Sequence, residues 1–574
     1  MALNLGTTAL TALYLGSTAI STAYLGSVQV YDAGGGGADA YAIGGISPEL
    51  VASFLTQENG STEGEYFRTA GVEDDFSMFT FSTSNTRTMF DSTGTLVWAP
   101  HNLMDGSHNF DNETYWFSQN ITEVASTTNG PDGSTKMWAL TDADGSNYGG
   151  LLDVGTVPFP STDTLFTFEI WITKDNDETR FPCLEVNGSN DFYLHVNTKT
   201  GAHAFEYNTA SATASIFEAV TGLWRVRVTF LARGASNVNL YPARGTVIGT
   251  PSVAATGTTE FGFLAIYRSD LGGMADNPDQ PAGLEKYVPT TTAAVYLPRR
   301  NAYYYNGTSW VKGGLQLESR AATQLLHGTD SFATQTETVT AQAYTLQFRG
   351  TGSIALTGAH TATLNGTGAD VLVSLTFTPS AGTLTLTPSG TVDYPQLEVG
   401  STPTSYIPNT AGSGTVTRAA ETLSIAGVNS PISATEATLA ADVLLTSDGL
   451  GPEIFNILSG GNWVRVYPRN VFGTYAQWRP SYVPDVSSAQ GGTISAGINQ
   501  PVTVALGIKA NDFVQLAAQG NAGTALATTT ITDFSGRNIG ISGNITEGSF
   551  FYKSIRVWST KLPEADLITA GTAS

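Results

Sequence analysis

The sequence predicts a mainly β protein, in which short N-terminal strand repeats precede tandem antiparallel β-sandwich domains. Of its 574 residues, 62 are glycine, 41% are hydrophobic and only 13% are charged, a composition typical of strands and tight turns. Several segments alternate apolar and polar residues with a period of two, as half-buried strands do. Because one core cannot serve a chain of this length, we expect about three or four domains.

The first predicted strands belong to a repeat at the N-terminus. The units LGTTALTALY, LGSTAISTAY and LGSVQVYDAG begin at Leu5, Leu15 and Leu25. Each opens on Leu-Gly and small hydroxyl residues, which predicts a turn followed by a short strand. Such strands bury no core of their own, so we expect residues 1–32 to stack on copies of themselves or against a partner. The alternative, a signal peptide or membrane anchor, lacks a basic segment, and Gly and Thr interrupt every apolar run.

Residues 33–100 are expected to form a glycine-rich linker and a connecting segment. Gly34 to Gly37 and the Gly44-Gly45 pair mark the flexible part. A brief helix is predicted from Pro48, because Ser47 can cap it and proline suits the first helical position. Further along, the turn at Asp91-Ser92-Thr93-Gly94 predicts a hairpin that leads into the next module.

The segment 101–298 is predicted to be one antiparallel module, with strands at TLFTFEIWIT, NDFYLHVN and GLWRVRVTFLA. Trp224 is expected to pack inward, whereas Trp171 lies among polar residues on the face opposite the core. Trp171 is therefore either a platform for a sugar ring, or a contact between modules or part of the core. The core face of the first strand is expected to comprise Phe166, Phe168, Ile170 and Ile172.

A connecting hairpin and a second, smaller module are predicted over 299–420. The hairpin carries three tyrosines and Trp310 around Asn306-Gly307, and we expect these aromatic residues to join two modules. TQLLHGTDSF near Thr323 resembles HNLMDGSHNF near His101, which indicates that one type of module occurs twice. Since the strands of the second copy contain no tryptophan, we interpret this module as a spacer.

The last domain, 421–574, is predicted to be another sandwich. Within NWVRVYPRN, strand alternation turns Val464 and Val466 to the core and leaves an aromatic and basic row on the other face. Aromatic rings stack on sugars while Arg and Gln donate to hydroxyl groups, so this row is either a glycan site or an interface. The row is expected to comprise Trp463, Arg465, Tyr467, Tyr475 and Gln477.

Charge and cysteine usage exclude several classes of function. Lys and Arg number 26 against 49 Asp and Glu, and the resulting net charge of −23 repels nucleic acid and anionic membranes. Cys183 is the single cysteine, which excludes a disulfide framework and a multi-thiolate metal site. We expect it to be buried. The histidines lack metal-ligand spacing, so no metal or other cofactor is predicted, although the acidic turn in ALTDADGSN could hold calcium.

Two groups of phrases resemble proteins of tailed bacteriophages, and a third resembles a widespread sandwich fold. The repeat from Leu5 to Tyr31 is similar to one at the N-terminus of tail and fibre proteins. The ordered phrases TMFDSTGTL, NLMDGSHNFDNETYW and NGPDGSTKMW resemble the start of carbohydrate-binding-like jelly-roll modules. The ending SIRVWSTKLPEADLITA resembles a concanavalin A-like or laminin G-like sandwich, in which a strand bearing tryptophan precedes a short helix, here expected to start at Ser559 or Thr560, before Lys561-Leu562-Pro563-Glu564.

This resemblance implies a structural and adhesive virion protein, a tail or head fibre displayed on the particle surface after assembly in the host cytoplasm. It implies attachment to other virion proteins through the repeats and recognition of a host-surface glycan by lectin-like domains. Because the repeats lack a core, we expect a homo-oligomer, most simply a trimer.

The alternative function is a glycan-degrading tail spike, since a glycosidase needs only two carboxylates that can be distant in sequence. No nucleophile elbow, P-loop or zinc-protease motif occurs, and no catalytic residue is predicted.

Overall fold

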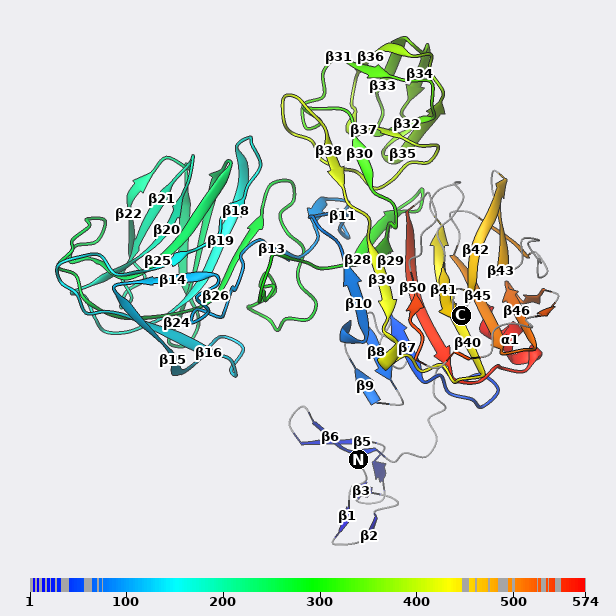
Figure 1. Ribbon diagram of the computed structural model, residues 1–574, viewed down its shortest axis with the longest axis horizontal. Coiled ribbons are helices and arrows are strands. Elements are labelled where there is room, and N and C mark those ends of the chain that lie inside the picture. The colour runs from blue at the N-terminus through cyan, green and yellow to red at the C-terminus, as the bar shows by residue number, and fades with distance from the viewer. Residues whose placement is uncertain are drawn as a thin grey trace.

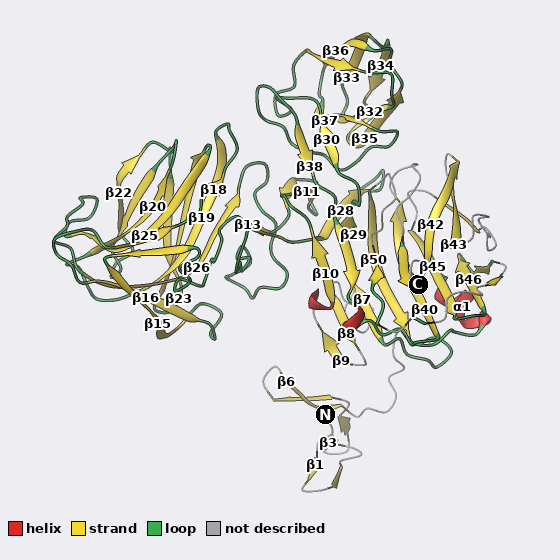
Figure 2. Ribbon diagram, viewed as in Figure 1, coloured by secondary structure: helices red, strands yellow, loops and turns green. Residues whose placement is uncertain are grey.

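The computed structural model describes residues 41–55, 65–69, 76–445, 454–459, 501–523, 525–527, 533–534, 536–541 and 549–572, together with the backbone of short strands between and before these segments. Nearly all described elements are strands in antiparallel sheets, drawn yellow in Figure 2. They form a large sandwich, a jelly roll and a small sandwich, preceded by separate hairpins (Figure 1). The predicted fold class is therefore confirmed.

The N-terminal repeats form hairpins. Their strands pair antiparallel, two by two, and each pair is a sheet of its own. The pairs are β1 (Asn4–Leu5) with β2 (Thr8–Ala9), β3 (Leu13–Leu15) with β4 (Thr18–Ile20), and β5 (Thr22–Leu25) with β6 (Val28–Asp32). The leucine that opens each repeat thus ends one strand of a pair, whereas the sequence predicted that it belongs to a turn followed by a short strand.

The large sandwich is assembled from three separated parts of the chain. β7 (Leu50–Ser53) and β29 (Trp310–Leu317) both pair with β50 (Phe550–Trp558), and β10 (Phe79–Ser82) pairs with β39 (Thr422–Ile425). The expectation that 33–100 serves as a linker and connecting segment is therefore wrong for its strands, which belong to the same sandwich as 421–574. The jelly roll and the small sandwich are insertions into it.

Two sheets make up this sandwich. The first contains β50, β29 and β7 with β8 (Tyr66–Thr69), β9 (Val72–Asp74), β11 (Thr88–Phe90), β12 (Leu96–Trp98), β28 (Arg299–Tyr305), β40 (Glu436–Leu445), β45 (Pro501–Lys509), β46 (Phe513–Ala518), β47 (Asn521–Ala522) and β48 (Leu526–Ala527). The second contains β10 and β39 with β41 (Phe455–Ser459), β42 (Asn462–Phe472), β43 (Tyr475–Val483), β44 (Ile494–Gly497) and β49 (Ile539–Gly540). Short 3₁₀ turns occur at Phe76–Met78 and Gly427–Asn429.

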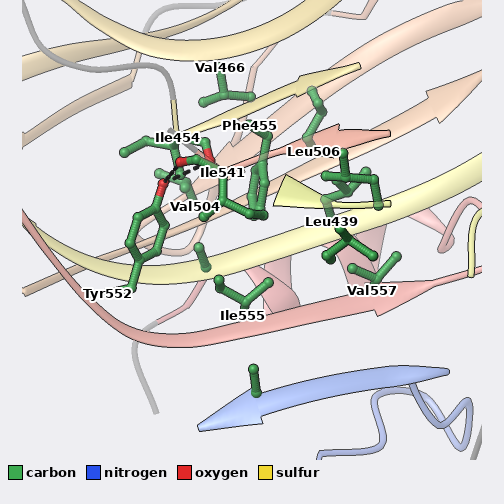
Figure 3. Close-up of a cluster of buried hydrophobic side chains, with 14 of the residues drawn as sticks. Leu439, Ile454, Phe455, Val466, Val504, Leu506, Ile541, Tyr552, Ile555 and Val557 are labelled. Atoms are coloured by element: carbon green, nitrogen blue, oxygen red, sulfur yellow. Dashed lines mark hydrogen bonds between the residues drawn. The ribbon is translucent and has the colours of Figure 1, made fainter. Parts of the chain in front are cut away.

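Apolar side chains from both sheets meet in one core, part of which is drawn in Figure 3. Tyr552 reaches across this core, and its hydroxyl donates toward the carbonyl oxygens of Ile454 and Ile541. Because that hydroxyl is paired, a large aromatic side chain is buried there without an unsatisfied polar group. Val466, also drawn in Figure 3, and Val464 are fully buried, as predicted.

The helix expected from Pro48 is wrong. Leu50–Ser53 is the strand β7, which lies between β50 and β8 with all four residues buried. Pairing on both sides and full burial outweigh a local capping signal. The helix expected near the C-terminus is present as α1 (Glu564–Ala570), after the strand that carries the buried Trp558, but its N-cap residue is Pro563 and not the expected Ser559 or Thr560. The described residues contain no helix able to span a bilayer.

The jelly roll consists of two sheets around one core. Its six-stranded sheet orders β15 (Ile121–Asn129), β16 (Lys136–Asp142), β26 (Gly257–Arg268), β19 (Thr164–Thr173), β24 (Leu223–Ala232) and β23 (Thr213–Val220). Its seven-stranded sheet orders β14 (Trp116–Gln119), β17 (Gly150–Asp153), β25 (Ala235–Gly245), β20 (Phe181–Asn187), β21 (Phe192–Val196) and β22 (His203–Asn208), with β18 (Val157–Pro158) on β25. Phe166, Phe168, Ile170, Ile172 and Trp224 lie in the core, and Cys183 is buried, all as predicted.

The small sandwich has the two sheets expected of a second, smaller module. One orders β31 (Gln335–Val339), β36 (Gly382–Ser389), β33 (Ser353–Gly358) and β34 (Ala362–Asn365), and the other β35 (Gly368–Phe377), β32 (Tyr344–Gly350) and β37 (Asp393–Val399). Each insertion is joined to the large sandwich by a paired neck. The necks are β13 (His101–Asn102) with β27 (Val295–Tyr296) for the jelly roll, and β30 (Ala322–Gln324) with β38 (Val416–Arg418) for the small sandwich.

Trp310 of the connecting hairpin contacts the small sandwich, but the hairpin strands β28 and β29 belong to the large sandwich, so the prediction that the hairpin joins the jelly-roll module to the second module is wrong about which modules meet there. The ring centroids of Trp310 and Phe90 are 4.7 Å apart. The guanidinium of Arg349, from β32, lies 4.8 Å from the ring of Phe90 and 5.1 Å from that of Trp310. Tyr394 packs edge-on against Phe90. These rings therefore hold the small sandwich against the large one.

A buried group of charged residues, called here the junction cluster, lies where the chain passes between the large sandwich and its insertions. It comprises Arg87, Arg299, Glu318, Arg418 and Glu421, each with at most 3% of its surface exposed. Arg299 Nη2 lies 2.9 Å from Glu318 Oε2 and 2.6 Å from Glu421 Oε2. Arg418 Nη1 lies 2.7 Å from Glu318, and Arg87 Nε lies 2.8 Å from Glu421. Burial alone would raise the pKa of Glu318, but Arg418 and Arg299 lower it to about 2.

Candidate functional site

Trp171 is not a ligand-facing residue, so its assignment to a glycan site is wrong. The side chain is fully buried in a cluster with Trp98, Met274 and Tyr287. Trp98 comes from β12 of the large sandwich, and Met274 and Tyr287 come from the segment after β26. That segment covers the outer face of the six-stranded sheet, which strand alternation alone cannot reveal. The other interpretation of Trp171, a contact between modules, is the one that the structure supports.

The row predicted on the C-terminal sandwich lies on paired strands. In β42 and β43, Trp463 pairs with Val483 and Arg465 pairs with Ser481. Tyr475 and Gln477 also pair with residues of β42, but on the other side of a register shift between the two strands. The side chains of Trp463, Arg465, Tyr467, Tyr475 and Gln477 lie outside the described residues. This glycan site therefore stays a prediction.

A different row is visible on the outer face of the seven-stranded sheet of the jelly roll. The row contains one residue from each of six neighbouring strands, and each residue pairs directly with the next one in the row. Their sequence neighbours Trp116, Leu151, Leu240, Leu184, Leu194 and Phe192 pack in or line the core, which places the row on the outer side. The row consists of Phe117, Leu152, Asn239, Glu185, Tyr193 and Tyr207. In Figure 1, β20, β21 and β22 lie at the left-hand end of the molecule.

Exposure along this row is greatest at its two ends. Phe117 is 58% exposed and Tyr207 48%, whereas Glu185 is 3% exposed and Asn239 9%. Tyr193 is half-buried and packs edge-on against Tyr207, with ring centroids 5.8 Å apart. The face thus exposes aromatic rings at its two ends, whereas the polar residues in its middle are buried.

Beside the row, one arginine is surrounded by tyrosine rings. The guanidinium of Arg244 lies 4.8 Å from the ring of Tyr148, 5.1 Å from that of Tyr193 and 4.7 Å from that of Tyr241. Its Nε donates to Glu206 Oε2 over 2.9 Å. Cation–π contacts and this ion pair together fix the orientation of the three rings. We call Arg244, Glu206, the three tyrosines and the row described above the tyrosine face.

The titratable groups of the tyrosine face are held in defined states. Burial, assisted by Glu185, raises the pKa of Tyr193 and of Tyr241, so both phenols are neutral hydroxyl groups that can donate or accept hydrogen bonds. Burial alone would raise the pKa of Glu206, but hydrogen bonds from Arg244 and His195 lower it, which keeps this carboxylate charged. Burial lowers the pKa of His195, which favours the neutral ring.

One group of potential metal ligands lies at this face. Within the described residues, Cys183, His195 and Glu206 bring ligand atoms to within 4.8 Å of one another. The His195 ring and Glu206 already bond to each other at 2.9 Å, and Arg244 occupies the same carboxylate. Burial raises the pKa of the Cys183 thiol well above its usual value. These groups therefore fit a hydrogen-bonded network better than a metal centre.

The acidic turn considered for calcium is satisfied by its own backbone. Asp142 accepts hydrogen bonds from the amides of Asp144 and Gly149, and Asp144 accepts one from Ser146. This pattern is that of an Asx-type turn.

Sequence reasoning missed the tyrosine face, although part of its signal was readable. In NDFYLHVN, Phe192, Leu194 and Val196 alternate with Tyr193 and His195, so that one face of the strand is aromatic and polar. What the sequence could not supply is the order of strands, which brings β14 and β22 to opposite ends of the same row.

The fold and this face together define a multidomain β-sandwich protein with an exposed aromatic and polar sheet surface. No protein-family model and no curated protein matches the chain. Among solved structures it is similar to the binding domain of botulinum neurotoxin serotype G, with 10% identity over 26% of this chain and 39% of that one and a TM-score of 0.20.

Two further solved structures are similar to the chain at comparably low sequence identity. Domain 4 of a GH43 extracellular arabinanase from Geobacillus stearothermophilus, in complex with arabinotriose, matches at 11% identity over 28% of this chain and 79% of that one. The tandem CBM22 domains from Paenibacillus barcinonensis match at 8% identity over 80% and 98%, and both TM-scores are 0.20. The chain spans about two fifths of the length of the neurotoxin domains that it matches. Because these TM-scores are low, the sandwich architecture is assigned from the sheets of this chain and not from the similarities.

Proposed function

We propose that this chain is a structural and adhesive virion protein of a tailed bacteriophage, a fibre whose jelly roll binds a glycan. The observation that carries the binding part is the tyrosine face. The exposed rings of Phe117 and Tyr207 and the half-buried ring of Tyr193 offer apolar surfaces for the C–H side of a sugar, and the half-buried carboxylate of Glu206 can accept hydrogen bonds from its hydroxyl groups. The phage part is supported by the resemblance of the N-terminal repeats and the module phrases.

Alanine at Tyr193 and Tyr207 together is expected to abolish measurable glycan binding while the chain stays folded. Each ring that stacks on a sugar contributes about 1 to 3 kcal/mol if it behaves like other stacking platforms. Adsorption of the intact protein to host cells and to isolated surface polysaccharide measures the effect.

Phe217→Ala is the matched control, because Phe217 is 39% exposed on β23, in the other sheet of the same module. Equal loss in the control would contradict the assignment of binding to the tyrosine face. Release of reducing ends from the polysaccharide would favour the glycan-degrading alternative.

The N-terminal hairpins support attachment to the particle and a homo-oligomer, most simply a trimer. Each is a separate two-stranded sheet, and isolated hairpins of this length are marginal in water. Further strands from other chains would complete them.

Deletion of residues 1–32 is expected to abolish incorporation into particles and to reduce the protein to monomers. The large sandwich is expected to remain folded, because β7 is its first strand along the chain. Light scattering and a particle-sedimentation assay measure the two effects. Incorporation of the shortened chain at the normal level would refute the anchoring role.

A further inference from the structure

The tyrosine face has an unequal balance of charges. Glu185 and Glu206 lie on it, and Asp191 stands close enough to raise the pKa of Tyr193 further. Among the outward-facing side chains of these strands, all within the described part of the chain, Arg244 is the one permanent cation. Three carboxylates therefore lie on or beside this face, against one guanidinium.

That guanidinium is not free for a ligand. Arg244 Nε and Nη2 both bond to Glu206, at 2.9 and 3.2 Å, and its flat faces are occupied by tyrosine rings. The ion pair keeps Arg244 and Glu206 charged and joined, although burial alone would lower the pKa of Arg244 and raise that of Glu206. In the loops at the ends of the strands, Lys199 pairs with Glu178, and Arg233 pairs with Asp163.

An acidic sugar would consequently bring its carboxylate toward Glu206, and toward the charge of the buried Glu185 beneath the surface, without meeting an available cation. Like charges near a surface of low dielectric repel each other, and an unpaired desolvated carboxylate is costly. A neutral sugar avoids this cost, and its hydroxyl groups can donate to the many acceptor oxygens of the face.

We infer that the tyrosine face binds uncharged, hydroxyl-rich sugars and discriminates against uronate- and sialate-containing ones. This inference rests on the proposed function and adds the chemical class of the ligand. It also assigns Glu206 a role in specificity, because this residue occupies the only guanidinium that could pair with a sugar carboxylate.

The experiment compares the intact protein on a printed array of neutral, uronate-containing and sialate-containing oligosaccharides, at salt concentrations from about 0.05 to 0.5 M. Wild-type protein is expected to bind neutral probes at all these concentrations and to leave acidic probes unbound. Glu206→Gln is expected to gain at least about tenfold in affinity for acidic probes at low salt, because Arg244 is released.

Glu178→Gln is the matched control: it removes the same charge from the same module at an exposed ion pair. It is expected to leave the preference unchanged. Preference of the wild-type protein for acidic probes, or an unchanged preference in Glu206→Gln, would overturn the inference while the face remained a glycan site. Binding that is insensitive to Tyr193→Ala with Tyr207→Ala, or no binding to any probe, would overturn the proposed function itself.

Discussion

Replacing Arg299 with alanine is expected to destabilise the large sandwich by about 3 to 5 kcal/mol, the usual effect of removing one partner from a buried ion pair. Arg299 is fully buried and serves both Glu318 and Glu421, so its loss leaves two buried carboxylates with one arginine each. Hydrogen exchange of the β28 and β29 peptides, measured by mass spectrometry on the intact chain, reports this loss separately from the other domains.

The pH dependence of the Arg299→Ala effect provides an internal check. The pKa of Glu318 is lowered to about 2 in the folded chain, below its unfolded value of about 4.3. Its stabilising contribution is therefore complete above the unfolded pKa and is lost as the pH falls toward 2. The difference between wild type and variant should shrink over the same range.

Lys199→Ala is the control for this experiment, since the Lys199–Glu178 pair is half-exposed, with 42% and 51% of the side chains accessible. It is expected to change stability by less than about 1 kcal/mol. Similar exchange rates in Arg299→Ala and wild type would show that the junction cluster contributes little to stability.

Trp171→Ala is expected to destabilise the jelly roll by about 3 to 5 kcal/mol, because it opens a cavity among Trp98, Met274 and Tyr287. Exchange of the β19 peptide measures the effect, and the exposed Phe217→Ala variant again serves as the control. A Trp171→Ala protein that kept its stability but no longer bound glycan would restore Trp171 as a ligand-facing residue.

The residues of a strand that face the core could be predicted from sequence where the alternation of apolar and polar residues along that strand decides which side chains are buried. Phe166, Phe168, Ile170 and Ile172 alternate in sequence, and one inner face receives all four. The short helix after the strand that bears Trp558 was also predicted, although it begins at Glu564 and not at the start signal of Ser559 or Thr560.

The errors came from contacts between segments that are distant in the sequence. Leu50–Ser53 forms a strand because β50, some five hundred residues later, lies beside it. Trp171 is buried because another segment covers its sheet. The row from Phe117 to Tyr207 needs five strand pairings that no local pattern encodes.

The paired necks of the two insertions have a consequence for how this chain can vary. Asn102 lies opposite Val295, and Ala322 lies opposite Arg418, so each inserted module begins and ends at adjacent points. A segment whose ends already meet can be exchanged for another with the same end-to-end separation, and the strands of the host sandwich keep their partners. The large sandwich can thus accept different inserted domains at these two positions while its own fold stays the same.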